Sequence, residues 1–218
     1  MLKTLFKVLI FTPIIFSHTA LAQESNSIQF NGGIIMPLSS SKGLSGSVQF
    51  NYPLTEVFEL YINTGYAVWD KYNVTFQEEL IPPQKQQYFK TYLADDHTLI
   101  PVYLGGKLTF NRNKIFSAYA NFEIGYSHLT YNSYGILKSI DPETGVVLGY
   151  YPDATTRINH SEDLLGFGFG AGLTHPMTRN LNLILGFKLN TFLNDNYRGF
   201  FSSRGTYTMF HLGFSFKI

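Results

Sequence analysis

The residues of this sequence that could carry chemistry are a few charged side chains set among small and polar neighbours. Five of them lie in segments where Gly, Ser, Asn, Thr or Tyr recurs at alternate positions: Glu59, Lys107, Glu123, Lys188 and His211. An ionised side chain inside a narrow protein interior is costly unless it has a partner of opposite charge. We therefore expect Glu59 and Glu123 to pair with Lys107 or Lys188, either as a structural plug or as a gate on a narrow ion path.

A second group, Asn159-His160-Ser161-Glu162, contains the residue types of nucleophilic catalysis. It lies where a polar stretch meets an apolar strand, and we interpret it as a loop-to-strand junction. Adjacent residues of an extended strand point to opposite sides, so His160 and Ser161 should not share a proton. We expect a polar loop end here and no catalytic residue.

Other site types are not supported. Gly166, Gly168 and Ala171 fit a dinucleotide-binding spacing, but that fingerprint requires a following helix, and HPMTRN follows instead. The six histidines show no metal-ligand spacing, and the absence of cysteine excludes disulfides and thiolate metal sites. We expect no metal and no cofactor. The net charge of +1 argues against a nucleic-acid partner.

Extended strands must position these residues, and the last fourteen residues, 205–218, show this best. One alternate row is apolar and the other is small, polar or charged, as expected for a strand with two different faces. The apolar row is Phe210, Leu212, Phe214, Phe216 and Ile218, and the other row includes Met209, His211, Gly213, Ser215 and Lys217.

The same period of two recurs along the chain and predicts an all-β, eight-stranded antiparallel up-and-down barrel. The expected strands are 27–36, 44–52, 57–69, 98–110, 115–128, 164–174, 181–193 and 205–218. The expected connections alternate between short turns, such as 111–113, and longer loops, at 70–97 and 194–204. Within 137–163, Pro142 and Gly145 predict a hairpin turn, so we expect the fifth strand to continue into that hairpin.

The composition and the N-terminus indicate the compartment. Residues 1–22 have a basic start, an apolar middle and the sequence Ala20-Leu21-Ala22, which predicts a secretory signal peptide cleaved after Ala22. Residues 23–218 would then form the barrel. Charged residues make up only 14 % of the chain and aromatic residues 17 %, which suits a surface that faces lipid.

The apolar rows are too bulky to fill so narrow a barrel, whereas the polar rows suit its interior. In particular, Gly166, Gly168, Gly170 and Gly172 leave space for tyrosines from other strands. We also expect two girdles of aromatic residues at the membrane surfaces. These are Tyr52, Phe110 and Phe116 near the short turns, and Tyr66, Trp69, Tyr126 and Phe192 near the long loops. The alternative is a soluble, lipocalin-like periplasmic barrel.

On these alternating segments the chain resembles the small eight-stranded outer-membrane barrels of the OmpX, OmpW and OmpA-transmembrane-domain type, and most of all the outer membrane protein β-barrel domain family of Bacteroidota. The final GFSFKI resembles the C-terminal signal read by the barrel-assembly machinery, although it ends in Ile218 rather than Phe. The resemblance implies a Gram-negative outer-membrane location, with lipid and lipopolysaccharide as surroundings. We expect that this chain, unlike full OmpA, has no soluble peptidoglycan-binding domain, since no residues remain after the barrel, and we expect a monomer.

The expected function is a structural or interaction role, in adhesion, envelope integrity or as a secretion accessory. The lumen would be plugged by side chains, and exposed loops would recognise an extracellular protein partner. The first alternative is a narrow channel for ions or small solutes. The second is a lipid A-modifying enzyme, which Asn159-His160-Ser161-Glu162 brings to mind because such barrels place His, Ser and a carboxylate at the lipid face.

Overall fold

The structure, a computed structural model, describes residues 25–38, 40–78, 86–110, 115–193 and 206–218. These residues form eight β-strands, and no helix among them is long and apolar enough to cross a membrane. The strands are β1 (Ser27–Pro37), β2 (Gly43–Pro53), β3 (Phe58–Glu78), β4 (Gln87–Phe110), β5 (Ser117–Ile140), β6 (Val147–Pro176), β7 (Leu181–Phe192) and β8 (Thr206–Lys217). The predicted signal peptide, the 111–113 turn and the 194–204 loop lie outside the described residues.

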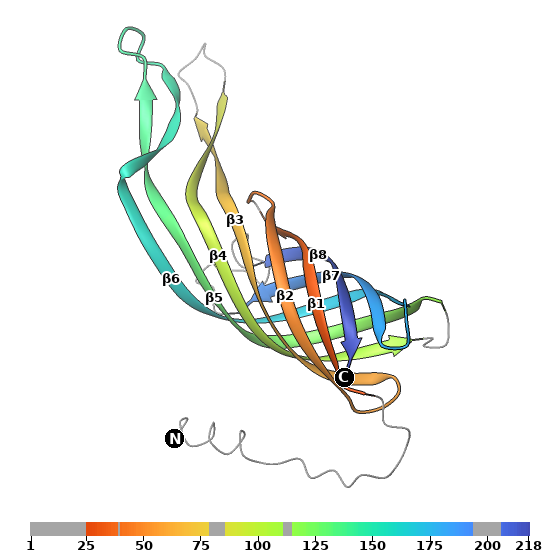
Figure 1. Cartoon of the computed structure of the whole chain (residues 1–218). Coiled ribbons are helices and arrows are strands. Elements are labelled where there is room, and N and C mark those ends of the chain that lie inside the picture. The colour runs from red at the N-terminus through yellow and green to blue at the C-terminus, as the bar shows by residue number, and fades with distance from the viewer. Residues whose placement is uncertain (1–24, 39, 79–85, 111–114, 194–205) are drawn as a thin grey trace, which may run out of the picture.

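The strands close into an antiparallel barrel in chain order, as the alternation predicted (Figure 1). Each strand pairs with its neighbours in sequence, and β1 pairs with β8 to complete the ring. In that closing ladder Phe30 lies opposite Phe214, so two rows of the sequence pattern meet on the same face. The barrel leaves no free strand edge along this seam, which is what a spanning sheet requires in lipid.

The apolar rows point outward and the polar rows point inward. On β4, Leu104 is 63 % exposed while its neighbour Tyr103 is 1 % exposed. The same contrast holds on β5 between the exposed Ile124 and the buried Glu123. A water-soluble barrel would bury the apolar row instead, so the exposed row is the surface that meets acyl chains.

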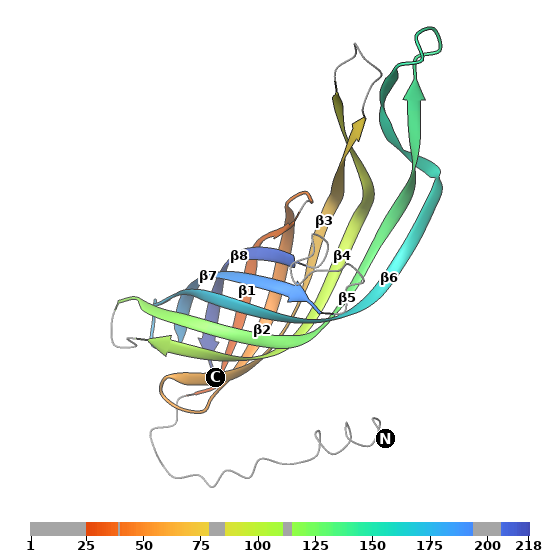
Figure 2. The ribbon, with the colours of Figure 1, turned by 180° about the vertical axis from the view of Figure 1, so that it is seen from behind.

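The strands are of two lengths, which the period of two alone did not predict. β1, β2, β7 and β8 have 11 or 12 residues, whereas β3 to β6 have 21 to 30. The four long strands rise beyond the barrel as two hairpins, β3–β4 and β5–β6, which stand side by side (Figures 1 and 2). From Ser127 to Ile140, β5 alone extends on the order of 40 Å.

Two predictions need correction here. Residues 70–97 were expected to be a loop, but β3 continues to Glu78 and β4 begins at Gln87. The period of two is lost there because the hairpin has left the membrane, and the ladder shifts register between Tyr72 and Asn73. Residues 159–162 were expected at a loop-to-strand junction, but they lie inside the continuous strand β6. The predicted continuation of the fifth strand into the hairpin is confirmed.

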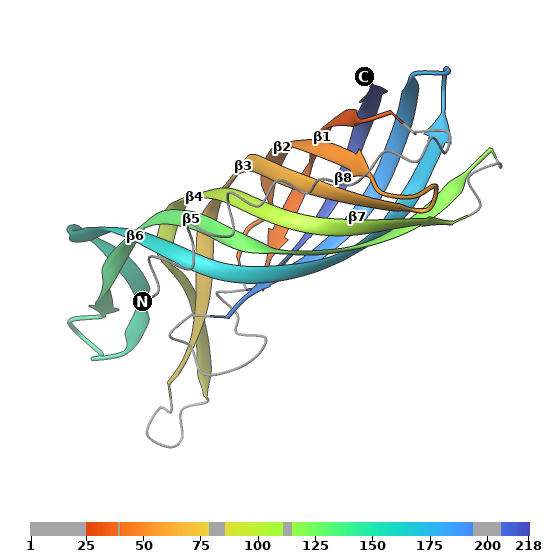
Figure 3. The ribbon, with the colours of Figure 1, turned by 90° about the horizontal axis from the view of Figure 1, so that it is seen from below.

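The two hairpins are packed against one another above the barrel. Tyr150 of β6 stacks on Phe76 of β3, with ring centroids 4.7 Å apart, and meets the edge of Phe89 of β4 at 5.5 Å. Its hydroxyl donates a hydrogen bond to Glu78, which also forms an ion pair with Lys138 Nζ at 2.5 Å. The two hairpins therefore form one extracellular arm on one side of the barrel, and Figure 3 shows β3 to β6 running out beyond the ends of β1, β2, β7 and β8.

The aromatic girdles are only partly as predicted. Tyr52, Phe110, Phe116, Tyr66 and Tyr126 are exposed on the outer face, but Trp69 and Phe192 are buried. These two rings point into the barrel because they fall on the inward row of their strands. The regular outward-facing apolar rows of the long strands end at Val68, Ile100, Tyr126 and Leu165, and we take the membrane-spanning part to end there.

Candidate functional site

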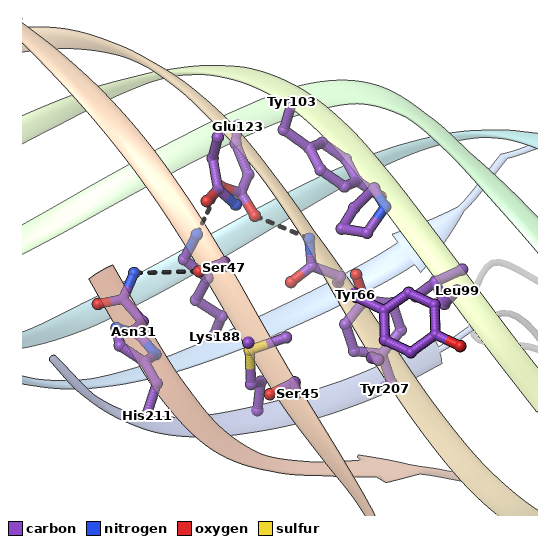
Figure 4. A pocket seen from close by; sticks show the side chains of 16 residues that line it. Asn31, Ser45, Ser47, Tyr66, Leu99, Tyr103, Glu123, Lys188, Tyr207 and His211 are labelled. Carbon is purple, nitrogen blue, oxygen red and sulfur yellow. Dashed lines mark hydrogen bonds and ion pairs between the residues drawn. The ribbon is translucent and has the colours of Figure 1, made fainter. Parts of the chain in front are cut away.

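The lower barrel interior holds a buried carboxylate, Glu123 of β5, with three donors around it. Lys188 Nζ of β7 lies 2.8 Å from Oε2, and the Tyr61 hydroxyl of β3 donates to the same oxygen at 2.9 Å. Asn190 Nδ2 donates to Oε1 at 3.0 Å. Figure 4 shows Glu123 and Lys188 facing each other across this space. Three strands far apart in sequence are thus joined through one charged group.

The other charged residues of the interior extend this arrangement. Lys107 Nζ lies 2.6 Å from Glu59 Oε2, and the two residues are cross-strand neighbours on β4 and β3. His211 Nε2 lies 3.4 Å from the Tyr119 hydroxyl. Both acidic residues are therefore paired with lysines as the sequence predicted, and each charge is balanced within the lumen.

Tyrosine rings fill the space left by glycines in the barrel wall. A Cβ on Gly172 would lie 2.5 Å from the Tyr119 ring, and one on Gly166 would lie 2.9 Å from the Tyr103 hydroxyl. The prediction that tyrosines occupy this space is confirmed for these two, whereas Gly168 meets Asn190 and Gly170 meets Asn121. The cavity beside Glu123 measures only about 20 Å³, room for about one water molecule.

The extracellular end of the barrel is different, because its interior is apolar. Ile35, Leu99, Leu129, Leu164 and Phe192 form a buried cluster there, together with Trp69. Above the cluster is a pocket of about 300 Å³, which we call the mouth pocket. It is lined by Trp69, Leu129, Leu164 and Phe192 of that cluster and by polar residues of the arm, including Ser133, Tyr134, His160 and Glu162. The pattern of alternating residues did not predict this site, because the inward rows were expected to be polar along their whole length.

A column of four rings crosses the wall of the mouth pocket. Trp69 of β3, His97 of β4, Tyr131 of β5 and His160 of β6 stack in that order. Their centroids are 4.9, 5.4 and 4.8 Å apart, and successive planes differ by 10 to 13°. Burial lowers the pKa of His97, so this ring is held in its neutral form. The column makes a continuous aromatic wall at the barrel entrance.

His160 and Ser161 face opposite sides of β6, as predicted, and each has its own partner. His160 Nε2 lies 2.6 Å from Ser133 Oγ on the pocket side. On the outer side, Ser161 Oγ lies 3.2 Å from His128 Nε2, and His128 Nδ1 lies 2.8 Å from Asp163 Oδ1. Sequence reasoning could not find the second arrangement, because it depends on the register between β5 and β6. Among the described residues, no cluster of His, Asp or Glu is arranged to hold a metal ion.

The comparisons with known proteins agree with the fold. No protein-family model matches the sequence, and no curated protein sequence matches it either. Neisserial surface protein A has a similar structure, with 13 % identity and a TM-score of 0.56 over 88 % of this chain and 97 % of that one. A major outer membrane protein from Thermus thermophilus is similar at 11 % identity and a TM-score of 0.52, over 89 % and 100 % of the two chains. The chain therefore has the fold of the small outer-membrane β-barrels, and its lipid-facing surface places it in that membrane.

Proposed function

We propose that this chain is a non-conducting outer-membrane barrel whose extracellular arm recognises a partner outside the cell. The observation that carries the proposal is the set of contacts around Glu123. Lys188, Tyr61 and Asn190 reach this carboxylate from β7 and β3, so hydrogen bonds bridge the lumen from wall to wall. The charges serve as a plug rather than a gate, because opening an ion path would separate a buried ion pair.

The arm supports the interaction part of the proposal. Its two hairpins are joined by Tyr150, Glu78 and Lys138, so they present one rigid surface rather than two independent loops. Recognition by residues held on a rigid scaffold is the usual arrangement in binding proteins. The partner would be an extracellular protein, as an adhesion, envelope-integrity or secretion-accessory role requires.

The remaining features of the proposal concern assembly. The chain acts as a monomer, surrounded by lipid and lipopolysaccharide, after removal of residues 1–22. The C-terminal strand β8 would be the segment that the barrel-assembly machinery reads. Its outward residues Phe210, Leu212, Phe214 and Phe216 support this, since they give the alternating apolar signal.

Planar-bilayer recording of the purified barrel tests the plug. We expect no stepwise current from the wild type at neutral pH. The variant Glu123→Ala with Lys188→Ala removes the bridge and enlarges the small cavity, and it serves as the comparison. Stepwise current from the wild type would contradict the proposal and favour the narrow channel for ions or small solutes.

Deletion of the arm tests recognition separately. A variant that joins Trp69 to His97 and Thr130 to Ser161 by short turns keeps the lower barrel ladders intact. We expect it to reach the outer membrane but to lose adherence of expressing cells to immobilised host-matrix or bacterial-surface proteins. If cells that express the variant adhere as well as cells that express the wild type, the arm is not the recognition surface.

A further inference from the structure

The outer face of the arm's base carries a serine, a histidine and an aspartate in the order that nucleophilic catalysis uses. Ser161 Oγ lies 3.2 Å from His128 Nε2, and Asp163 Oδ1 lies 2.8 Å from His128 Nδ1. The imidazole thus has the serine on one nitrogen and the carboxylate on the other. This is the arrangement in which a carboxylate orients a histidine that removes a proton from a serine.

The strand register builds this arrangement. His128 of β5 is paired directly with Asp163 of β6, and Thr130 is paired with Ser161. Residues directly opposite each other, and those two positions apart on one strand, share a face of the sheet. The four side chains therefore lie together on the outer surface, where Ser161, His128 and Asp163 are exposed.

The position relative to the membrane identifies the substrate class. One step down the ladder, Tyr126 is paired with Leu165, and Ile100 of β4 is paired with His128 itself. Tyr126 and Ile100 are exposed on the lipid-facing surface. A tyrosine in this position marks the boundary between acyl chains and headgroups, which is the depth of the acyl ester bonds of membrane lipids. We propose that Ser161, His128 and Asp163 form an esterase site that cleaves acyl esters of outer-leaflet lipids.

The reaction follows from the contacts. Ser161 Oγ attacks the ester carbonyl carbon while His128 Nε2 accepts the hydroxyl proton. The ester C–O bond breaks, and the alcohol leaves with the proton that His128 returns. Water then attacks the acyl-serine, with His128 again accepting a proton, and releases the fatty acid and Ser161. One ester and one water give one carboxylic acid and one alcohol, without any other reactant.

Two neighbours have supporting roles. Asp163 is a positioning residue, because it acts on the substrate only through the orientation of His128. Thr130 lies opposite Ser161 and offers a hydroxyl on the same face, where the oxyanion of the intermediate would form. The expectation of no catalytic residue rested on His160 beside Ser161. The structure keeps those two apart and supplies a different histidine from the adjacent strand.

The full chain, refolded in detergent, is treated with a long-chain alkyl fluorophosphonate, and the intact mass is measured. We expect one adduct, on Ser161, which should be absent in Ser161→Ala and should form about 100-fold or more slowly in His128→Ala. The matched control is Ser133→Ala, which removes a serine that also contacts a histidine, His160, but on the pocket side. Asp163→Asn should react slowly, and Asp163→Glu should recover part of the rate.

Vesicles then identify the ester. One vesicle preparation contains phosphatidylethanolamine alone, and the other contains purified lipopolysaccharide in addition. Released fatty acid is measured by mass spectrometry. Release from the first preparation identifies a glycerophospholipid ester, and release from the second preparation alone identifies a lipid A ester. Circular dichroism confirms that each variant is folded. A folded wild type that forms no adduct would overturn the proposal, and so would an adduct that still forms in Ser161→Ala. The proposal is also overturned if neither vesicle preparation releases fatty acid.

Discussion

Lys188 Nζ lies 2.8 Å from Glu123 Oε2 inside the barrel, and no more than 9 % of either side chain is exposed. Two charges from β7 and β5 thus neutralise one another where water has almost no access. The stability of the barrel depends on both being present, because a lone buried charge has no compensation.

Removing one member of this pair should be worse than removing both. Glu123→Gln leaves the Lys188 ammonium without its counter-charge and should lower the free energy of unfolding by about 3–5 kcal/mol. Glu123→Met with Lys188→Met should cost less. Urea titration of the barrel in lipid vesicles gives both values. The exposed pair Arg157–Asp96, 3.8 Å apart, is the control, and Arg157→Met should cost less than about 1 kcal/mol. Equal losses in the single and double variants would show that the charge balance has no role.

Gly172 should not tolerate a side chain. An alanine Cβ there would lie 2.3 Å from the Leu185 carbonyl oxygen and 2.5 Å from the Tyr119 ring, so β7 or the ring would have to move. We expect Gly172→Ala to destabilise the barrel by about 1–3 kcal/mol. Gly32→Ala is the control, since a Cβ there meets no atom within 4 Å. Equal stability of the two variants in urea would contradict the proposed packing.

The stability cost of a charge on the outer face should depend on how deep the residue lies in the membrane. Leu104 lies in the middle of the lipid-facing row, beside Ile124, and Leu104→Arg should cost about 2–4 kcal/mol. Ile115 lies beside the start of β5, near the membrane surface, and is 72 % exposed. Ile115→Arg should therefore cost only about 0–1 kcal/mol. The difference is measured by urea unfolding in vesicles, and a similar cost at both positions would argue against the assigned lipid boundary.

The two hairpins should separate in acid. Hydrogen bonds from Lys138 and Tyr150 hold the pKa of Glu78 below its usual value. The contact therefore stabilises the arm at pH values above the ordinary glutamate pKa of ~4.3, and its contribution is lost as the pH falls through the lowered pKa. Hydrogen-exchange protection of the hairpin amides should decrease over that range, while the barrel amides stay protected.

At pH 7, Glu78→Gln should reproduce the low-pH protection pattern of the wild type. Glu143→Gln, in the turn between β5 and β6, removes the same charge and should leave protection unchanged. An arm that is equally protected in Glu78→Gln and wild type would refute the linkage between the hairpins.

Trp69, the only tryptophan, reports on the ring column. It stacks on His97, whose pKa is lowered by burial. The neutral ring therefore favours the folded column above the ordinary histidine pKa of ~6.5, and this contribution is lost as the pH falls through the lowered value. The fluorescence of Trp69 should change with a midpoint below ~6.5, because the imidazole stacked on the indole gains a charge there. His97→Phe should remove the transition, and a midpoint at or above the ordinary histidine value would contradict the buried stack.

The sequence was sufficient to predict the barrel because the membrane imposes a strict period of two on every spanning strand. Leu104 and Tyr103 show this clearly, since Leu104 faces the lipid and Tyr103 lies in the narrow barrel interior. The lysine–glutamate pairs also followed from the pattern, because few charges share the interior. Above the membrane this constraint disappears, so the lengths of β3 and β4 were underestimated. The Tyr, Phe, Thr and Val residues in 72–76 and 88–92 were the available signal, as they favour strands.

Two sites could not be predicted from the sequence, for a different reason. The ring column and the Ser161–His128–Asp163 arrangement both need the relative register of strands that are separated by about 30 residues or more in sequence. A one-residue slip between β5 and β6 would send each side chain to the opposite face. Trp69 shows the limit for single residues too, since an aromatic ring near a strand end suits either the lipid boundary or the barrel mouth.

The unequal strand lengths give the protein a front and a back within the plane of the bilayer. A molecule drifting toward β4 and β5 meets a tall wall, whereas one approaching β1 and β2 meets strands that stop near the membrane surface (Figures 1 and 2). A partner that binds the tall side would therefore have to approach the barrel from that side of the membrane plane.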